Sequence, residues 1–305
     1  MSTPTTATGV AAVVETSITP AVQYRDYSGY RFRSEVDWIE LKLVTATPTN
    51  FQTVRRRLGI GFANPKASGA GGACTEFNVR FQEPKSWADI DERLKRLTVD
   101  HPLAELPTVT GIEIALDAYS TNQQRADLVA MAAHFYNGAT KFVSTNRRAS
   151  RRERESYALK TRSQLQNLIA KGYNIYIGNQ VDAEHQHIYL KETDSSTALP
   201  PHQQRARTEF TLKREMLPKQ SFSDWQGHDF TKFASFFKFR HLKFDLSPWA
   251  ATPMHAKAQV GERRARKTSK GYGRAFSHAT VADIKLNALA YDALRELTRR
   301  WRCSV

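Results

Sequence analysis

The sequence predicts an α+β fold with a mostly antiparallel central sheet, flanking helices and a basic, partly helical C-terminal portion. Residues 38–45 and 75–81 alternate apolar and polar side chains, a pattern typical of half-buried strands. Three more strand-like runs, at 173–178, 185–191 and 206–213, follow one another across short links. Short links favour antiparallel neighbours, because parallel strands need a long crossover connection.

The first half of the chain alternates predicted strands and helices. Thr49 and Asn50 carry side chains that can cap a helix N-terminus, and Gly59 suits the end of that helix. Ser86 can cap a second helix in the same way. The predicted elements in this half are helices at 50–58, 87–97 and about 122–137, the last closed by Gly138, and a further strand at 109–119.

The second half holds one more predicted helix, at 164–171, before the three strands, and then an aromatic and basic region. Phe233, Phe236 and Phe237 have helical spacing, and such a stripe is more often core than a stacking platform for bases. Residues 280–301 form an amphipathic helix, whose apolar set is Ile284, Leu286, Leu289, Leu294 and Leu297. The predicted organisation is a disordered tail at 1–23, an α+β domain at 24–220 and a smaller region at 221–305.

Charge and composition narrow the class of partner. The net charge is +15 and the pI is about 9.9, an excess that favours a polyanion, since each Lys or Arg near a phosphate releases counterions. No apolar run is long enough to span a bilayer, so nucleic acid is favoured over membrane. Cys74 and Cys303 lie in no ligand cluster, which excludes a structural zinc site and suits a reducing compartment. Residues 1–23 lack signal-peptide features, and we expect a cytoplasmic protein.

One predicted strand carries a face of side chains suited to chemistry. His185, His187, Tyr189 and Lys191 are two residues apart and share a face, while Ile188 and Leu190 point into the core. Tyrosine suits attack on a phosphodiester, because a phosphotyrosine link can later be reversed by a DNA hydroxyl. A neighbouring ammonium favours the phenolate. The alternative is a tyrosine half-buried in the sheet with its hydroxyl in solvent.

Acidic residues on the predicted strands supply a second candidate site. Glu113 and Asp117 are four apart on one strand and share a face, and Glu209 lies among apolar residues on a later strand. Carboxylates that converge near a phosphate are the ligands that Mg²⁺ or Mn²⁺ prefers. The alternative, left open by the spacing, is that these acids pair with arginines.

The order of these motifs resembles the replication initiation factor family, the rolling-circle replication initiators of plasmids, integrative elements and filamentous phages. The resemblance covers about residues 108–213. It comprises the acidic strand, then Ile-Tyr-Ile-Gly, Ile-Tyr-Leu-Lys and Arg-Thr-Glu-Phe-Thr-Leu. It implies that Tyr189 is the nicking tyrosine, that Lys191 is the lysine after it, and that Glu209 with Glu113 or Asp117 binds the metal. It also implies a 5′-phosphotyrosine link and a bacterial host. The sequence departs from the family pattern at His187, usually Arg, and at Leu190, usually Asp or Asn.

Two alternatives stay open at this point. His185 and His187 flank one residue, like the metal-binding pair of another nickase class, although Gln186 replaces the bulky apolar residue expected between them. In that interpretation Tyr157 or Tyr291 is the nucleophile. The other alternative is a non-catalytic origin-binding protein or transcriptional repressor. No phosphate-binding loop of the Gly-x-x-x-x-Gly-Lys-Ser/Thr type is present, so an ATP-dependent enzyme is disfavoured.

The expected partner is DNA, both a duplex origin and a single strand, with a host helicase and a second copy of the chain as further partners by analogy. The DNA contacts are expected mainly from two basic segments, which position the backbone without specifying sequence. The expected DNA-binding residues are Arg147, Arg148, Arg151, Arg152, Arg207, Arg263, Arg264, Arg266, Lys267, Lys270 and Arg274.

Overall fold

A computed structural model describes residues 27–66, 72–136, 143–147, 155–157, 162–178, 182–194, 196–218, 221–242 and 280–302. Four expectations from the sequence lie outside these residues: the tail at 1–23, the helix end at Gly138, the basic residues at 148–154 and the basic loop at 261–274.

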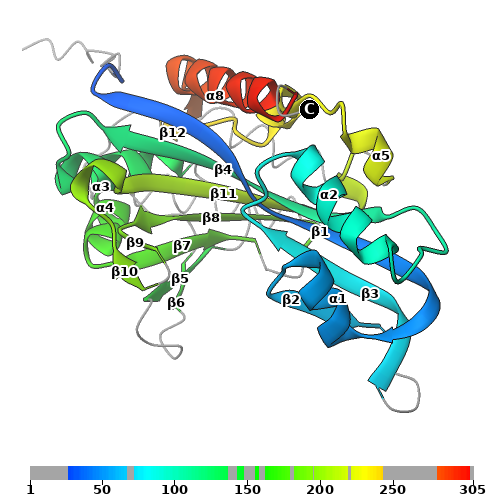
Figure 1. The fold of residues 1–305 in the computed structure, drawn as a ribbon. Helices are drawn as coiled ribbons and strands as arrows, with labels where there is room; N and C mark the ends of the chain where they lie inside the picture. The colour runs from blue at the N-terminus through cyan, green and yellow to red at the C-terminus, as the bar shows by residue number, and fades with distance from the viewer. Residues whose placement is uncertain are drawn as a thin grey trace, which may run out of the picture.

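The described residues form one long antiparallel sheet with helices, which confirms the predicted α+β class (Figure 1). The strand order is β2-β3-β1-β4-β11-β8-β7-β5-β6, and every neighbouring pair is antiparallel. The strands are β1 (Tyr30–Asn50), β2 (Phe62–Pro65), β3 (Ala73–Gln82), β4 (Thr108–Ser120), β5 (Val143–Arg147), β6 (Glu155–Tyr157), β7 (Tyr173–Ile177), β8 (Glu184–Lys191) and β11 (Arg205–Lys213). Two short pairs complete the strands, β9 (Thr193–Asp194) with β10 (Thr197–Ala198) and β12 (Arg240–Leu242) with β13 (Thr280–Ala282).

The strand β1 is much longer than the predicted strand at 38–45. Its whole length pairs with two neighbours in turn, with β4 from Tyr30 to Lys42 and with β3 from Trp38 to Asn50. The pairing with β4 shifts register between Val36 and Trp38, so Asp37 is the extra residue of a β-bulge. A bulge turns a side chain away from the regular alternation, and this one sets the direction of the Asp37 carboxylate.

Helix ends follow the local signals in the sequence. The Asn50 side chain accepts a hydrogen bond from the backbone N–H of Gln52 at the start of α1 (Phe51–Leu58), and Gly59 ends that helix with a φ of 63°. Ser86 accepts from the backbone N–H of Asp89 at the start of α2 (Trp87–Thr98). Both predicted caps are therefore confirmed. The third helix, α3 (Arg125–Phe135), starts later than predicted, after a turn in which Gln123 has a φ of 56°.

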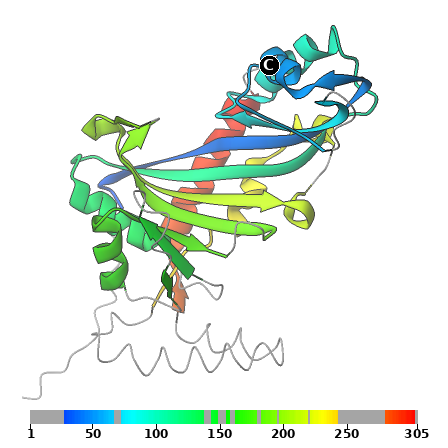
Figure 2. The same cartoon turned by 90° about the horizontal axis from the view of Figure 1, so that it is seen from below.

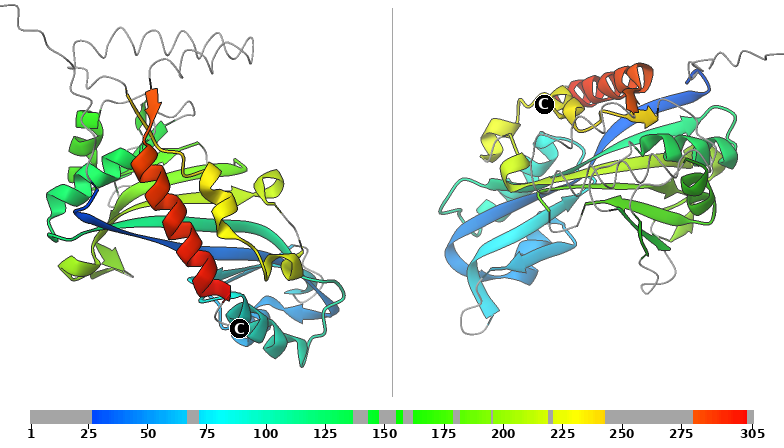
Figure 3. Two further views of the ribbon diagram at one scale, coloured as in Figure 1. Left: turned by 90° about the horizontal axis from the view of Figure 1, so that it is seen from above. Right: turned by 180° about the vertical axis from the view of Figure 1, so that it is seen from behind.

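The helices pack on one face of the sheet. The C-terminal helix α8 (Ile284–Arg302) lies across the strands, and the segment 221–242 runs beside it (Figure 3). Helices α3 and α4 (Arg162–Ala170) cover the end of the sheet near β8 and β7. Apolar side chains of β4 and β11 face these helices and form the core with Leu286, Leu294 and Leu297 of α8. Seen from below, the strands lie in front of α8, and this side of the sheet is turned away from the helix (Figure 2).

The aromatic segment is less helical than predicted. Within the described residues 221–242, its helical elements are the short helix α5 (Phe222–Trp225) and a 3₁₀ helix, η4 (Phe230–Ser235). Its interpretation as core is confirmed, because Phe233 and Phe237 are buried, as is Trp225, although Phe236 is only partly buried. These aromatic side chains fill the space between α8, α2 and the sheet, so their spacing reflects packing rather than a regular helix.

Two further expectations need correction. Ile284 was expected on the apolar face of the last helix, but it is the first residue of α8 and is 79% exposed. Strands β2, β5 and β6 were not predicted, because they are short and lie at the ends of the sheet. Arg147, which the sequence places among the expected DNA-binding residues, is the last residue of β5. No helix in the described part of the chain combines the length and the apolar character needed to cross a membrane.

Candidate active site

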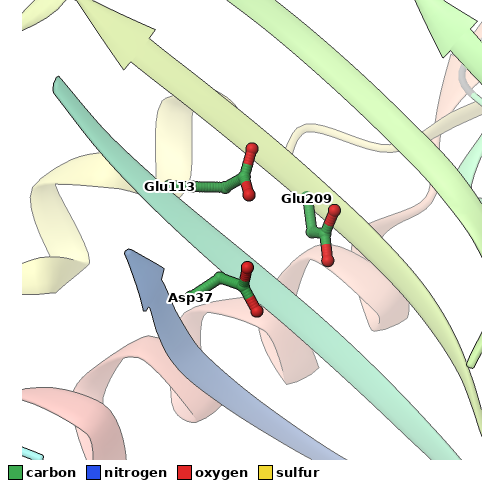
Figure 4. A group of neighbouring side chains, drawn as sticks. All are labelled: Asp37, Glu113 and Glu209. Carbon is green, nitrogen blue, oxygen red and sulfur yellow. The ribbon is translucent and has the colours of Figure 1, made fainter. Parts of the chain in front are cut away.

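Three carboxylates converge on the face of the sheet turned away from α8, which we call the outer face (Figure 4). Asp37 comes from the bulge in β1, Glu113 from β4 and Glu209 from β11. One oxygen of each residue lies within 4.8 Å of an oxygen of the other two. We call Asp37, Glu113 and Glu209 the carboxylate cluster. Its donor set consists of carboxylate oxygens, which suits a hard divalent cation such as Mg²⁺ or Mn²⁺.

The three carboxylates repel one another, and this repulsion shifts the pKa values of two of them. Burial and the neighbouring charge of Glu209 raise the pKa of Glu113 to about 8, although a hydrogen bond from Thr211 opposes this. Burial and the same charge raise the pKa of Asp37 above its usual value. A positive charge among these groups offsets their mutual repulsion, so the cluster has the electrostatic character of a cation site.

Glu209 is hydrogen-bonded through both of its carboxylate oxygens. Its Oε1 accepts a 2.6 Å hydrogen bond from the Tyr189 hydroxyl, and its Oε2 lies 3.0 Å from Nδ1 of His187. Nη1 of Arg207 lies 3.4 Å from Oε1. Burial alone raises the pKa of Glu209, but the hydrogen bond and charge of His187, with Arg207 and Tyr189, lower it to about 2. Glu209 is therefore a carboxylate whenever the protein is folded near neutral pH.

Tyr189 is a half-buried phenol that points at the cluster from β8. Burial and the negative charge of Glu209 raise its pKa well above the ordinary value, so the hydroxyl keeps its proton in this arrangement. Its ring stacks on His187, with the ring centroids 4.3 Å apart, and His187 stacks on Tyr176 of β7 at 4.4 Å. The prediction that His187 and Tyr189 share a face with His185 is confirmed, since His185 also stacks on Tyr176 at 5.7 Å.

The two histidines have different surroundings. His187 contacts Glu209 through Nδ1, and neither His185 nor His187 belongs to the carboxylate cluster. His185 is buried, and burial with the charges of His187 and Lys213 lowers its pKa to about 4. Within the described residues, the side chains that converge on one point are the three carboxylates. The two histidines do not take part in that cluster.

Asp117 and Arg207 form a buried ion pair beside the cluster. Nε and Nη2 of Arg207 donate to the two carboxylate oxygens of Asp117, at 2.6 and 2.7 Å, and Nη1 donates to Asp37 at 2.9 Å. Asp117 was expected as a metal ligand, but it lies outside the cluster and is occupied by Arg207. Arg207 was expected to bind DNA, but it is 3% exposed and bound to acids on the sheet, and this expectation is corrected.

Lys191, predicted beside the nucleophile, is buried at the end of β8. Its Nζ lies 3.6 Å from carboxylate oxygens of both Glu83 and Asp194. It also acts on the cluster over a longer distance, because its charge lowers the pKa of Asp37 and opposes the effect of Glu209.

The alternative tyrosines lie elsewhere. Tyr291 is exposed on α8, the helix on the opposite face of the sheet from the cluster. Tyr157 is on β6, the end strand, four positions from β11 in the sheet, or about 19 Å at the usual strand spacing. Of the three tyrosines, Tyr189 is the one that the structure shows in contact with the carboxylate cluster.

The functional residue that sequence analysis missed is Asp37. It precedes the alternating segment that predicted the first strand, and only the β-bulge turns it toward Glu113 and Glu209. Among the remaining basic residues expected at DNA, Arg147 lies on β5, while Arg148, Arg151, Arg152, Arg263, Arg264, Arg266, Lys267, Lys270 and Arg274 lie outside the described residues.

Together the fold and the site define an α+β protein with a tyrosine bonded to a carboxylate cluster on its sheet. No family model matches the sequence, and no curated protein matches it. Among solved structures, the chain is similar to a rolling circle replication initiator protein from Geobacillus stearothermophilus. The TM-score is 0.33 and the identity 13%, over 61% of this chain and 76% of that chain. A similarity this low carries no conclusion about activity.

Proposed function

We propose that this protein nicks one strand of DNA through Tyr189, with a divalent cation held by Asp37, Glu113 and Glu209. The observation that carries the proposal is the 2.6 Å hydrogen bond from the Tyr189 hydroxyl to Glu209, a member of the carboxylate cluster. A nucleophile bonded to an acceptor that adjoins a cation site is the arrangement that phosphoryl transfer to tyrosine needs.

DNA is the proposed substrate because of the charge of the chain and the nature of the nucleophile. A net charge of +15 favours a polyanion. The link that a tyrosine forms with phosphate preserves the energy of the broken bond, which suits a strand that is later rejoined. The motif resemblance described above adds the polarity, a 5′-phosphotyrosine and a free 3′-OH, and the role of a rolling-circle replication initiator acting at an origin. A host helicase and a second copy of the chain are proposed partners on the same ground.

In the proposed reaction the Tyr189 oxygen forms a bond to the scissile phosphorus and its proton passes to water, because Glu209, whose pKa is about 2, is too weak a base to keep it. Glu209 orients the hydroxyl through its hydrogen bond. The bond from phosphorus to the 3′-oxygen of the preceding deoxyribose breaks, and that oxygen takes up a proton from water to become the free 3′-OH, so no net proton is gained or lost. The bound cation would supply positive charge that offsets the cluster and the charge developing on the phosphate. His187 and Arg207 keep Glu209 ionised and oriented, and the His187 ring supports that of Tyr189.

The test is a cleavage assay on supercoiled DNA that carries the origin of the replicon encoding this chain. Wild type, Tyr189→Phe and Glu209→Gln are compared with Mn²⁺ and with EDTA, and products are run on a denaturing gel after protease treatment. We expect Mn²⁺-dependent nicking with protein covalently on the 5′ end, lost in both variants. Tyr291→Phe is the matched control and is expected to nick like wild type.

Two outcomes would overturn the proposal. Nicking that survives Tyr189→Phe moves the nucleophile to another tyrosine, and Tyr157→Phe then becomes the next variant. Tight origin binding without nicking under any metal condition identifies a DNA-binding regulator instead.

A further inference from the structure

A second group of side chains on the outer face lies next to Tyr189 in the sheet. Arg31 of β1 and Tyr119 of β4 are cross-strand partners, and Arg205 begins β11 on the other side of β4. The three side chains come from adjacent strands in the order β1-β4-β11. We call Arg31, Tyr119 and Arg205 the arginine clamp.

The tyrosine ring holds the two guanidinium groups in place. The Cζ atom of Arg31 lies 4.9 Å from the centroid of the Tyr119 ring, and that of Arg205 lies 5.7 Å from it. A guanidinium against an aromatic ring is attracted by the ring quadrupole and retains N–H groups that can donate to an anion. The clamp therefore presents two oriented cations, which are restrained before any ligand arrives.

One arginine of the clamp has no acidic partner among the described residues. Arg31 is exposed and forms no ion pair within the described part of the chain. Arg205 is 14% exposed, with its Nε 3.2 Å from Asp117 and its Nη1 donating to the backbone oxygen of Gln203 at 2.9 Å. Asp117 is also bonded through both oxygens to Arg207. Arg33, also exposed on this strand, pairs with Glu35. The unpaired charge of Arg31, oriented on the Tyr119 ring, is a reason to expect an anionic ligand at this place on the sheet.

The row of cross-strand partners that contains Arg205 lies two residues along the strands from the row that contains Tyr189. Arg205 is the cross-strand partner of Lys191, and Arg207 is the cross-strand partner of Tyr189. Residues two apart on a strand point to the same face and are separated by about 6.8 Å. Tyr189 is on β8, one strand beyond β11, so at the usual strand spacing its Cα is about 8 Å from that of Arg205 and about 12 Å from that of Tyr119. These separations are on the scale of one or two nucleotides of an extended strand, so a phosphate at the clamp and the scissile phosphate at Tyr189 can belong to one strand.

We propose that Arg31 and Arg205, held by Tyr119, bind a backbone phosphate of a single DNA strand within one or two nucleotides of the phosphate that Tyr189 attacks. The assignment of the attacked phosphate rests on the proposed function, whereas binding at the clamp is measurable without cleavage. A single strand is favoured over a duplex because the Tyr189 hydroxyl is half-buried among carboxylates on the sheet surface. A strand must lie flat on that surface to reach it, which an extended single strand can do.

The experiment measures binding of a short fluorescein-labelled oligothymidylate by fluorescence anisotropy, in EDTA so that cleavage cannot occur, over a series of salt concentrations. Arg31→Gln is expected to weaken binding roughly 5- to 10-fold at low salt and to lower the slope of log K against log salt by about 0.7, the loss of one phosphate contact. Arg299→Gln makes the same charge change on α8, across the sheet, and is expected to leave the slope unchanged.

Variants of Tyr119 distinguish the orientation of the two arginines by the ring from the effect of the net charge of the protein. Tyr119→Phe keeps the ring and is expected to bind like wild type, whereas Tyr119→Leu keeps the net charge and is expected to weaken binding several-fold. Equal binding by Tyr119→Leu and wild type, or an unchanged salt slope in Arg31→Gln, would overturn the proposal. Unlabelled duplex that competes as well as unlabelled oligothymidylate would overturn the choice of a single strand.

The outcome is separable from that of the cleavage assay. If the clamp variants behave as expected while Tyr189→Phe still nicks, the clamp stands and the assignment of the nucleophile fails. Thermal melting of each variant checks that it is folded. If Arg205→Gln does not fold because of its contact with Asp117, Arg31→Gln still tests the proposal, because Arg31 is exposed.

Discussion

The hydroxyl of Tyr189 donates to Oε1 of Glu209 across 2.6 Å, from β8 to the neighbouring strand β11. This contact joins two features that are independent in the sequence, a strand face with a tyrosine and a set of acids on other strands. It also gives Tyr189 a fixed position, since Glu209 is held in turn by His187 and Arg207.

Asp37 tests whether the carboxylate cluster binds a cation. Asp37→Asn removes the negative charge of one of the three converging carboxylates. We expect the affinity for Mn²⁺ to fall by about 10-fold or more, as measured by isothermal titration calorimetry. Glu40→Gln is the matched control, because Glu40 lies on the same strand but bonds to Arg80 and Thr110. An Mn²⁺ affinity that is equal in wild type and Asp37→Asn would show that the cluster is not the binding site.

Glu113 tests the electrostatics of the metal-free protein. Its folded pKa of about 8 lies above the ordinary value of about 4.3, so the folded chain holds a proton that the unfolded chain has lost between these two pH values. The free energy of unfolding should therefore fall as pH rises from about 4.3 to about 8. Glu113→Gln removes this dependence and should be more stable than wild type at pH 8, by roughly 1–3 kcal/mol.

The measurement for Glu113 is urea unfolding in EDTA at several pH values. Glu296→Gln, on an exposed position of α8, should follow the wild-type pH dependence. A Glu113→Gln variant whose stability falls with pH as steeply as that of wild type would contradict the proposed repulsion.

Asp117 tests the buried ion pair. Asp117→Asn leaves the buried Arg207 without its main counter-charge, and we expect a loss of about 3–5 kcal/mol of stability by urea unfolding. Asp292→Asn breaks the exposed pair with Arg295 on α8 and should cost under about 1 kcal/mol. Similar small losses in both variants would mean that Arg207 finds other partners on the sheet.

Trp301 tests whether α8 belongs to the core of the sheet domain. Its ring packs edge-on against Trp87 of α2, with the ring centroids 4.8 Å apart, and against Phe230, with the centroids 5.2 Å apart. The side chain is buried. Trp301→Ala should lower the free energy of unfolding by about 3–5 kcal/mol in a single transition. Tyr291→Ala, exposed on the same helix, should change it by less than about 0.5 kcal/mol. A separate early transition that is sensitive only to Trp301→Ala would indicate that α8 unfolds independently.

The elements that the sequence predicted best are those with strong local signals. Alternation in 75–81, 109–119 and 206–213 and the caps at Asn50 and Ser86 depend only on neighbouring residues, and the structure contains each of them. Short end strands and the 3₁₀ segment at Phe230–Ser235 have no such signal, because they depend on the surfaces against which they pack.

For the site, periodicity was enough to put His187 and Tyr189 on one face of a strand and to mark Glu113 and Glu209 as acids within strands. It could not say which acids meet. Glu113 and Asp117 share a face of the same strand, yet one joins the cluster and the other pairs with Arg207. The difference comes from the register of β4 with β11, where Asp117 is opposite Arg207 and Glu113 is opposite Thr211.

By itself, then, the sequence determined the class of fold, the basic charge that favours a polyanionic partner, and the strand faces on which the candidate side chains lie. These depend on composition and on the period of the backbone, which are local properties of the chain. The tertiary structure decided that Asp37 joins Glu113 and Glu209, that Arg207 is buried, and that Arg31 and Arg205 meet on Tyr119. Strand order, register and a single β-bulge set these meetings, and they arise only when segments far apart in the chain pair with one another.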